Sequence, residues 1–282
     1  MRLDLYLIGL LLVAAFSHAS WNAVLKSSGD RLFTMTTVMG IGVIFYGPAL
    51  FFVDVPPLDV WPFLIISFLL HLGYFFFLTY AYRQGDLSAV YPVARGCSPL
   101  MVAGGAALFA GQALGPVATA GVVAASIGIC LFAFEKGMPT RHLMKPLMMA
   151  FVVSCFIASY TVVDGLGLLR SETPYGYIAW LNFLDGIPLL IWVFVAKGEA
   201  YVRFLKTDGR KAAMGGILAM VAYGLVLYAL SVGGMAHVSA LRETSVLFAV
   251  ILGAVTLGEK FGPIRWVAAV AIVSGVTALQ LS

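Results

Sequence analysis

The stretch SALRETSVLFAV, residues Ser239 to Val250, sets two opposite charges side by side in an otherwise apolar run. A charge at the centre of a bilayer costs about 2.5–3.5 kcal/mol on insertion scales. The pair formed by Arg242 and Glu243 therefore needs surroundings that compensate it, either a polar cavity or a network of ion pairs between helices. The rest of the sequence indicates what those surroundings are.

The composition is that of a helical membrane protein with many spans. Of the 282 residues, 61% are hydrophobic and 11% are charged, and the mean hydropathy is +0.99; a soluble domain carries about 25% charged residues. The net charge is +4, and no basic run of the kind that binds nucleic acid is present. Cys97, Cys130 and Cys155 stand singly in apolar stretches, which predicts packing residues rather than a disulfide or metal site. No cofactor is predicted.

Charges and Gly/Pro clusters divide the chain into ten apolar segments of about 20 residues, the length that a helix needs to cross a bilayer. The first segment resembles a signal peptide after Arg2, but its apolar run continues to Lys26, which favours a retained helix. No long soluble linker separates the segments, so we expect one all-α integral membrane domain. The expected helices are residues 3–25, 32–53, 60–82, 87–110, 115–135, 145–169, 173–196, 211–232, 236–258 and 263–281.

Lys and Arg are divided unevenly between the two ends of the spans. Counting the breaks together with the adjoining ends of the spans, 13 of them fall at the odd-numbered breaks, and only Arg2 and Arg170 fall on the other side. The positive-inside rule places the larger group in the cytoplasm. Both termini are then predicted to lie outside a plasma (inner) membrane, because ten spans return the chain to its starting side.

The two halves of the chain align with each other. A shift of 147 residues superposes an arginine, a serine and a Gly-Pro pair: Arg242 on Arg95, Ser245 on Ser98, and residues 262–263 on 115–116. A shift of 139 aligns ASYTVV (158–163) with ASWNAV (19–24). Residues 1–135 and 145–282 then hold five spans each, and an odd number makes the second half enter from the opposite side. Such inverted repeats are typical of secondary transporters with a midplane site.

Arg242 is thus the second copy of Arg95, and we expect both to line a polar cavity between the halves. The alternative is a structural network in which Arg242 pairs with an acid and Arg95 with helix carbonyls. Adjacent helical residues point about 100° apart, so one of Arg242 and Glu243 is expected to face ligand while the other pairs with a neighbouring helix. For Glu243, proton coupling and a fixed pairing with Arg95 are equally good interpretations.

On the fourth span, Tyr91, Arg95 and Ser98 share one face by their spacing. Pro92 and Pro99 flank this face and free backbone carbonyls, because proline lacks the N–H group that would bond them. The pattern favours a bent helix beside a ligand, and a kink needed only for packing is the alternative.

Several other spans also carry polar or aromatic residues. Aromatic rings with a polar edge favour amphiphilic or cationic ligands, although packing alone also explains single rings. Asp185, near Gly186 and Pro188, is interpreted either as functional or as a cap of backbone N–H groups. The remaining candidates for the substrate site are His18, Trp21, Asn22, His71, Tyr74, Tyr160, Asp164 and Tyr223.

The ordered motifs resemble the ten-helix EamA-type proteins of the drug/metabolite transporter superfamily. The likeness rests on HASWNAVLKSSGDR (18–31), YPVARGCSPLMVAGGAALFAGQ (91–112), SYTVVDGLG (159–167) and HVSALRETSVLFAVILGAVTLGEKFGP (237–263). The resemblance implies an inverted 5+5 fold with a central cavity lined by spans one, three, four, six, eight and nine. It argues against a role of Asp185 in the substrate site, because the seventh span is expected to be peripheral. Members of the family commonly export amino acids, related metabolites or drugs, and some import.

We therefore expect a secondary transporter, an exporter of a small polar or zwitterionic metabolite such as an amino acid, working by alternating access. Proton coupling through Glu243 or Asp164 is an open alternative, as is uptake of a small organic cation. An intramembrane enzyme with Asp164 and Asp185 as a dyad is disfavoured, because GxGD, HExxH and GxSxG motifs are missing. A receptor without transport would tolerate Gln at both arginines. The expected partners are a small-molecule substrate and the bilayer, and both a monomer and a dimer are compatible with the sequence.

Overall fold

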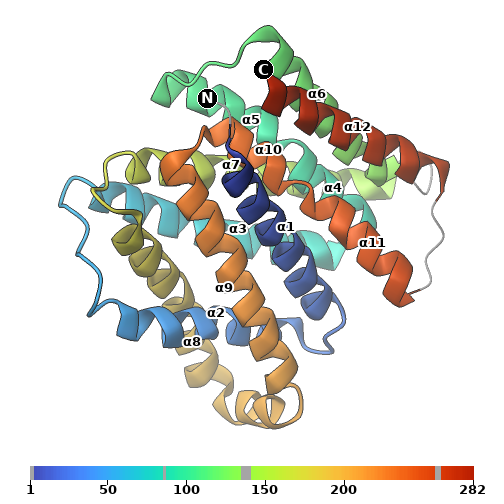
Figure 1. Cartoon of the computed structure of the whole chain (residues 1–282). Helices are drawn as coiled ribbons and strands as arrows, with labels where there is room; N and C mark the ends of the chain where they lie inside the picture. The colour runs from blue at the N-terminus through green and yellow to red at the C-terminus, as the bar shows by residue number, and fades with distance from the viewer. Residues whose placement is uncertain (1–2, 85–86, 135–140, 258–261) are drawn as a thin grey trace.

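The computed structural model describes residues 3–84, 87–134, 141–257 and 262–282, and that part of the chain is helical without any strand. The two ends of the chain lie near each other at one end of the bundle (Figure 1). The helices are α1 Leu5–Lys26, α2 Arg31–Ala49, α3 Trp61–Gln84, α4 Leu87–Gly96, α5 Ser98–Ala110, α6 Pro116–Leu131, α7 Arg141–Leu168, α8 Pro174–Thr207, α9 Gly209–Val232, α10 Met235–Arg242, α11 Ser245–Leu257 and α12 Pro263–Leu281, with a 3-10 turn at Phe132–Phe134.

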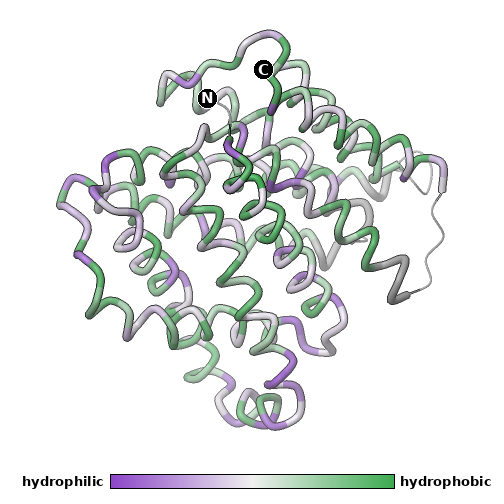
Figure 2. The backbone as a smooth tube through the Cα atoms, in the orientation of Figure 1, coloured by the Kyte–Doolittle hydropathy of each residue, from purple (hydrophilic) through white to green (hydrophobic). Residues whose placement is uncertain are grey.

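The predicted class, an all-α integral membrane protein, is confirmed. Within the described residues, nine segments are long and apolar enough to cross a membrane when α4 with α5, and α10 with α11, are each taken as one span. The helix α6 is apolar but shorter. Apolar residues run along the helices and hydrophilic ones gather at the turns between them (Figure 2).

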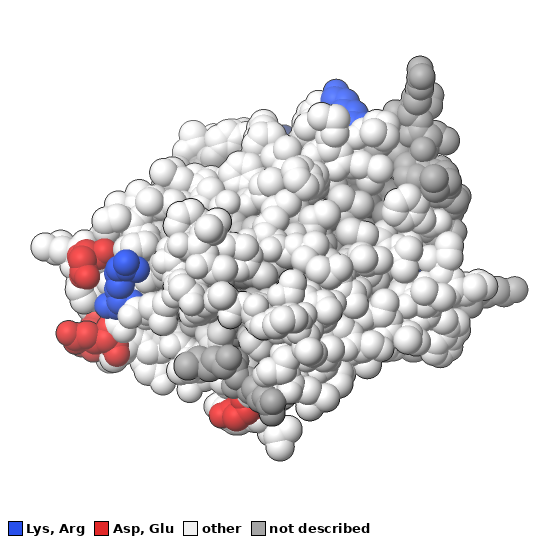
Figure 3. Space-filling view, turned by 90° about the horizontal axis from the view of Figure 1, so that it is seen from above, with Lys and Arg blue, Asp and Glu red and all other residues white. Residues whose placement is uncertain are grey.

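The outer surface is suited to lipid. Large apolar side chains on it are open to the surroundings, among them Phe76, Leu108 and Val195. Seen from above, the molecule shows a broad uncharged face with its charged side chains near the edge (Figure 3). A soluble protein of this size would not leave so much apolar surface uncovered.

Helix starts follow local chemistry. Asp4 and Asp30 precede α1 and α2, and their carboxylates accept hydrogen bonds from the backbone N–H groups of Leu7 and Phe33 at 2.7 and 3.0 Å. These bonds satisfy donors that have no partner inside the helix. Three other helices, α6, α8 and α12, begin with proline, which needs no such partner.

The fourth span, predicted as one helix, is interrupted at Cys97 between α4 and α5. The carbonyl of Arg95 would normally accept from the residue four positions on, but that residue is Pro99, which has no N–H. The hydroxyl of Ser98 donates to this carbonyl at 3.0 Å instead. Ser154 of α7 donates to the carbonyl of Ala94 at 2.9 Å, so the break is compensated within the bundle.

The ninth span is interrupted at the equivalent place, between α10 and α11 at residues 243–244. No proline causes this break. Thr244 donates its hydroxyl to the carbonyl of Leu241 at 2.7 Å, and this local bond competes with the regular helical ladder. Both broken spans therefore stop and restart beside the superposed arginines.

The seventh span was predicted to end at residue 196, and its helical geometry is interrupted at the next residue, Lys197; what was not predicted is that helix resumes after this break. The helix α8 continues to Thr207 across a kink at Lys197, whose φ and ψ are −144° and 24°. The extension is held against α2, where the hydroxyls of Tyr201 and Thr37 lie 3.0 Å apart and the ring of Phe204 packs on Phe33. Tertiary packing thus keeps a stretch helical that its five Lys and Arg in residues 197–211 had marked as a loop.

The helices of the two halves pack against each other in a pattern that is unchanged when the halves are exchanged. Among the contacting pairs, α1 with α9 exchanges with α3 with α7, while α2 with α8 and α6 with α12 are each their own equivalent. The predicted inverted repeat requires such an arrangement. Its boundaries, residues 1–135 and 145–282, stay predictions, and residues 135–140 lie outside the described residues.

Small residues bring α6 and α12 into backbone contact. A Cβ atom at Gly275 would lie 2.5 Å from the carbonyl oxygen of Gly121, and one at Gly128 would lie 3.0 Å from the carbonyl oxygen of Ala268. A shift of 147 residues exchanges these two contacts. Close helix approach over small residues is a main source of association inside a membrane, where no water drives apolar burial.

We expect Gly275→Ala to destabilise the protein by about 1–3 kcal/mol, the usual range for overpacking a tight contact. The measurement is the free energy of unfolding in detergent. Gly104→Ala on α5 is the matched control, because nothing lies within 4 Å of a Cβ built there. Equal stability of the two variants would contradict the proposed role of the α6–α12 contact.

The predicted orientation is testable at the C-terminus. A fused alkaline phosphatase after Ser282 is expected to be active and a fused green fluorescent protein dark, because the charge bias places this end outside. Arg2, and parts of three breaks predicted to be cytoplasmic, lie outside the described residues. A bright fluorescent fusion with an inactive phosphatase would reverse the orientation.

Candidate functional site

A partly open cavity lies within the bundle and encloses about 670 Å³ of empty space, counting its opening. Its walls come from α1, α2, α3, α7, α8 and α9. The lining residues are His18, Trp21, Val38, Met39, Gly42, His71, Tyr74, Phe75, Tyr160, Asn182, Asp185, Ala219, Met220 and Tyr223.

A smaller hollow of about 270 Å³ adjoins this cavity. The two share three wall residues, His18, Tyr160 and Tyr223. Both arginines of the broken spans, Arg95 and Arg242, line the smaller hollow and not the larger cavity. The charged side chains predicted to meet between the halves are thus brought together beside a cavity.

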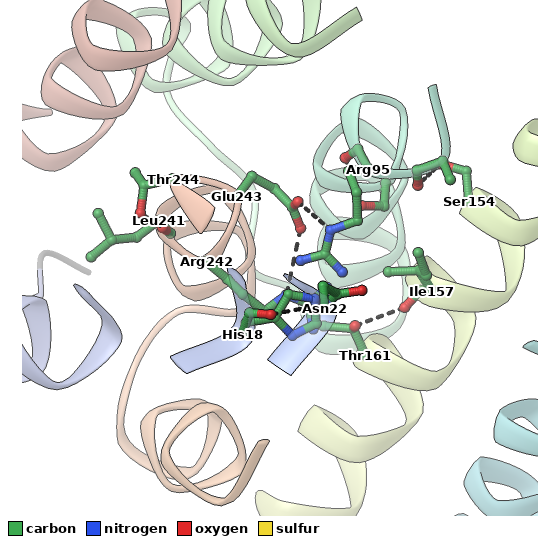
Figure 4. A network of polar contacts seen from close by, with 12 residues as sticks. His18, Asn22, Arg95, Ser154, Ile157, Thr161, Leu241, Arg242, Glu243 and Thr244 are labelled. Carbon is green, nitrogen blue, oxygen red and sulfur yellow. Dashed lines mark hydrogen bonds and ion pairs between the residues drawn. The ribbon is translucent and has the colours of Figure 1, made fainter. Parts of the chain in front are cut away.

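Glu243 connects the two arginines. Its Oε2 accepts from Nε of Arg95 at 2.7 Å, and its Oε1 lies 3.5 Å from Nε of Arg242. Figure 4 shows the carboxylate reaching from the break after α10 toward Arg95 on α4. All three side chains are at most 4% exposed. Two guanidinium groups therefore share one carboxylate in surroundings that water scarcely reaches.

The two interpretations of the arginine pair are both partly realised. Glu243 is fully buried, faces the neighbouring span and pairs with Arg95, whereas Arg242 lines the hollow. This is the division that the 100° angle between adjacent helical residues predicts. The structural alternative also predicted that Arg95 would pair with helix carbonyls. The structure shows an ion pair of Arg95 with Glu243.

A second buried acid, Asp164 on α7, is held by two tyrosines. The hydroxyl of Tyr177 donates to Oδ1 at 2.9 Å, and the hydroxyl of Tyr223 donates to Oδ2 at 2.5 Å. Tyr177 belongs to α8 and Tyr223 to α9, so the carboxylate ties three helices together. Asp164 lies behind the cavity wall and acts on it through the position of the Tyr223 ring.

Aromatic rings form the middle of the cavity wall. The imidazole of His71 stacks on Tyr160 with ring centres 4.1 Å apart, and Tyr223 meets Tyr160 edge to face at 6.2 Å. Nδ1 of His71 lies 2.9 Å from the carbonyl oxygen of Ser67 and 3.7 Å from Oδ2 of Asp185. This imidazole is therefore fixed in orientation between a ring and a carboxylate.

The predicted site residues divide into two groups. Eight line one or both hollows: His18, Trp21, His71, Tyr74, Arg95, Tyr160, Tyr223 and Arg242. Asn22, Asp164 and Glu243 do not line them; Asn22 donates to the carbonyl of His18 at 2.8 Å. Tyr91 lies on α4, and its side chain is outside the described part of the structure. A role of any of these residues in binding substrate stays a prediction.

The seventh span, expected to be peripheral, forms part of the cavity wall. Asp185 and Asn182 of α8 line it, as do Val38, Met39 and Gly42 of the second span. The expectation that Asp185 lies away from the cavity is thus corrected by its position in the cavity wall. The signal that favoured it was already present, because an acid in the middle of an apolar span is itself a functional indication.

Residues 144–280 match the model of the EamA-like transporter family. This match confirms the resemblance for the second half of the chain. A crystal structure of a protein aligns with 98% of this chain and 96% of its own, with a TM-score of 0.77 and 16% sequence identity. That likeness establishes a shared fold. No curated protein matches the sequence significantly.

The charge arrangement predicts that Glu243→Gln and Arg95→Gln lower the free energy of unfolding by different amounts. Glu243→Gln removes the carboxylate that both guanidinium groups contact and is expected to lower the free energy of unfolding by about 3–5 kcal/mol, as for other broken buried ion pairs. Arg95→Gln is expected to cost less, because Glu243 keeps its contact with Arg242. Chemical unfolding in detergent measures both.

The same substitution at the exposed Glu199 on α8 is the matched control and should change stability by less than about 0.5 kcal/mol. The double variant Arg95→Gln/Glu243→Gln is expected to be less destabilised than the sum of its single changes, since the two side chains interact directly. Equal losses for Glu243→Gln and Arg95→Gln would disprove the shared-carboxylate arrangement.

Proposed function

From the match of residues 144–280 to the EamA-like transporter family, we propose that the chain is a secondary transporter exporting a small polar or zwitterionic metabolite. The observation that carries the proposal is the cavity between the two sets of helices, lined by aromatic rings and by charges of both signs. We place the protein in the plasma (inner) membrane with both termini outside.

Alternating access explains why the charged groups lie on broken spans. In transporters with inverted repeats, the substrate site lies near the midplane, at discontinuous helices, and the two halves rock around it. Here the breaks at Cys97 and at residues 243–244 stand beside Arg95 and Arg242. The contacts of α1 with α9 and of α3 with α7 join the two halves around the cavity, so rocking would change access to it.

Of the two acids considered for proton coupling, Asp164 is the better candidate. Glu243 already contacts two arginines, so removing its charge would break an ion pair with each of them. Asp164 accepts hydrogen bonds from two neutral hydroxyls, and one of them, on Tyr223, belongs to a ring that lines both hollows. A proton on Asp164 would therefore alter the cavity wall directly.

Transport by purified protein in liposomes tests the proposal. We expect the protein to exchange at least one amino acid or related zwitterion, and Tyr74→Ala to reduce the rate at least about tenfold by removing part of the cavity wall. Phe76→Ala is the matched control, because this ring lies on the same helix and is 67% exposed on the outer surface.

An imposed pH gradient separates the driving forces. The wild-type rate is expected to depend on the gradient, and Asp164→Asn is expected to exchange substrate without responding to it. Failure of every metabolite class to move in a manner that depends on Tyr74 would reject the transporter proposal. Movement that ignores the gradient in both proteins would reject proton coupling alone.

A further inference from the structure

Arg242 has buried donors that no described residue satisfies. Its Nε and Nη2 are inaccessible and form no hydrogen bond within the described residues, and its contact with Glu243 is an ion pair at 3.5 Å. A buried charged donor without an acceptor is costly. Since Arg242 also lines the smaller hollow, an anionic group placed there would receive these hydrogen bonds.

The charges around the smaller hollow lead to the same class of group. Arg95 and Arg242 both line it, and Glu243 contacts both of them. Arg242 keeps buried donors with no acceptor in the described part of the chain, and a guanidinium group holds carboxylate or phosphonate oxygens with directed, charge-assisted bonds. The smaller hollow is therefore suited to the negative end of a solute.

The opposite charge lies in the other compartment. Asp185 lines the larger cavity, and its Oδ1 is buried without a hydrogen-bond partner in the described structure. The other titratable groups nearby are His71, at 3.7 Å, and Asp164, which the hydroxyls of Tyr177 and Tyr223 already occupy. An ammonium group of a ligand would give Asp185 the partner that a buried carboxylate needs.

Aromatic rings separate these two positions. The arginines line only the smaller hollow and Asp185 only the larger cavity, and the compartments meet at His18, Tyr160 and Tyr223. The stack of His71 on Tyr160 lies on the way from Asp185 to the arginines. A solute that bears both charges on one carbon atom, as an α-amino acid does, has no spacer between its charges to lie along these rings.

Building on the proposed transport function, we propose that the preferred solute is an elongated zwitterion with its charges at opposite ends. Arg242 binds the anionic end in the smaller hollow and Asp185 binds the cationic end in the larger cavity. The apolar middle of the solute lies along the rings of Tyr160 and Tyr223. Asp185 and Arg242 together thus select for the distance between the two charges of the solute as well as for their signs.

Binding of two isomers to the purified full-length protein tests the distance requirement. Isothermal titration is used to compare 5-aminopentanoate with norvaline, which has the same atoms but carries both charges on one carbon. We expect the first to bind at least about tenfold more tightly, or about 1.4 kcal/mol. Within the series from 3-aminopropanoate to 8-aminooctanoate, affinity is expected to pass through a maximum. Equal or tighter binding of norvaline, or no binding of any ω-amino acid, would overturn the inference.

Singly charged analogues assign each end to its residue. The wild type is expected to prefer 5-aminopentanoate over both pentylamine and pentanoate. Arg242→Gln should abolish only the preference over pentylamine, and Asp185→Asn only the preference over pentanoate. A simultaneous loss of both preferences in each variant would refute the assignment. Arg203→Gln, the same change at an exposed position of α8, is the control and should keep both.

Two further arms keep the test decisive. If Arg242→Gln does not fold, Arg242→Lys retains the charge with fewer directed donors and should weaken the preference over pentylamine. An aminoalkylphosphonate of matched length distinguishes a phosphonate from a carboxylate as the preferred anion. Binding as described without transport in liposomes would reject the transporter proposal alone, whereas transport of α-amino acids with no preference for the elongated isomer would reject only this inference.

Discussion

The contact of 2.7 Å between Arg95 and Glu243 is the constraint on which the centre of this molecule depends. Neither charge is tolerable alone at that depth, because the cost of burying an ion is offset only by a close partner and by hydrogen bonds. Arg95 belongs to the broken fourth span and Glu243 to the break in the ninth. Their pairing therefore brings two interruptions of helix, and the polar backbone at each, to the same place in the bundle.

The surrounding helices compensate the backbone hydrogen bonds lost at these interruptions and leave the space beside them open. Serine and threonine hydroxyls bond the carbonyls of Ala94, Arg95 and Leu241 near the breaks. Away from the site, α6 and α12 meet over Gly121 and Gly275 with no room for a side chain. Tight packing at one end of the bundle and satisfied breaks at its centre leave the cavity as the loosely filled region between the halves.

The features predictable from the sequence were those with a local or strictly periodic cause. The membrane class followed from composition, the starts of α6 and α12 from Gly-Pro pairs, and the different neighbours of Arg242 and Glu243 from helical geometry. The extension of α8 to Thr207 was missed because it depends on Tyr201 meeting Thr37 on another helix, a contact that no local pattern encodes.

The site was predictable residue by residue only where charge marked it. Arg95 and Arg242 stand out in any apolar sequence, and their superposition indicated a shared location. Asp185 stood out equally but lost weight to an expectation about which spans line the cavity. The lining by α2 and α8 arises from how the spans close around the rings of Tyr160 and Tyr223, which is a property of the packed bundle.

In the proposed transport cycle, Glu243 has a role in both the empty and the substrate-bound state. An alternating-access cycle requires the protein to change conformation without substrate at some step, and two uncompensated guanidinium groups would oppose closure of an empty cavity. The carboxylate between them offsets part of this charge, and Arg242 keeps donors without a hydrogen-bond partner among the described residues. Substrate binding then completes a pairing that the protein leaves partly open, so the free energy gained on binding is available where the two halves must move.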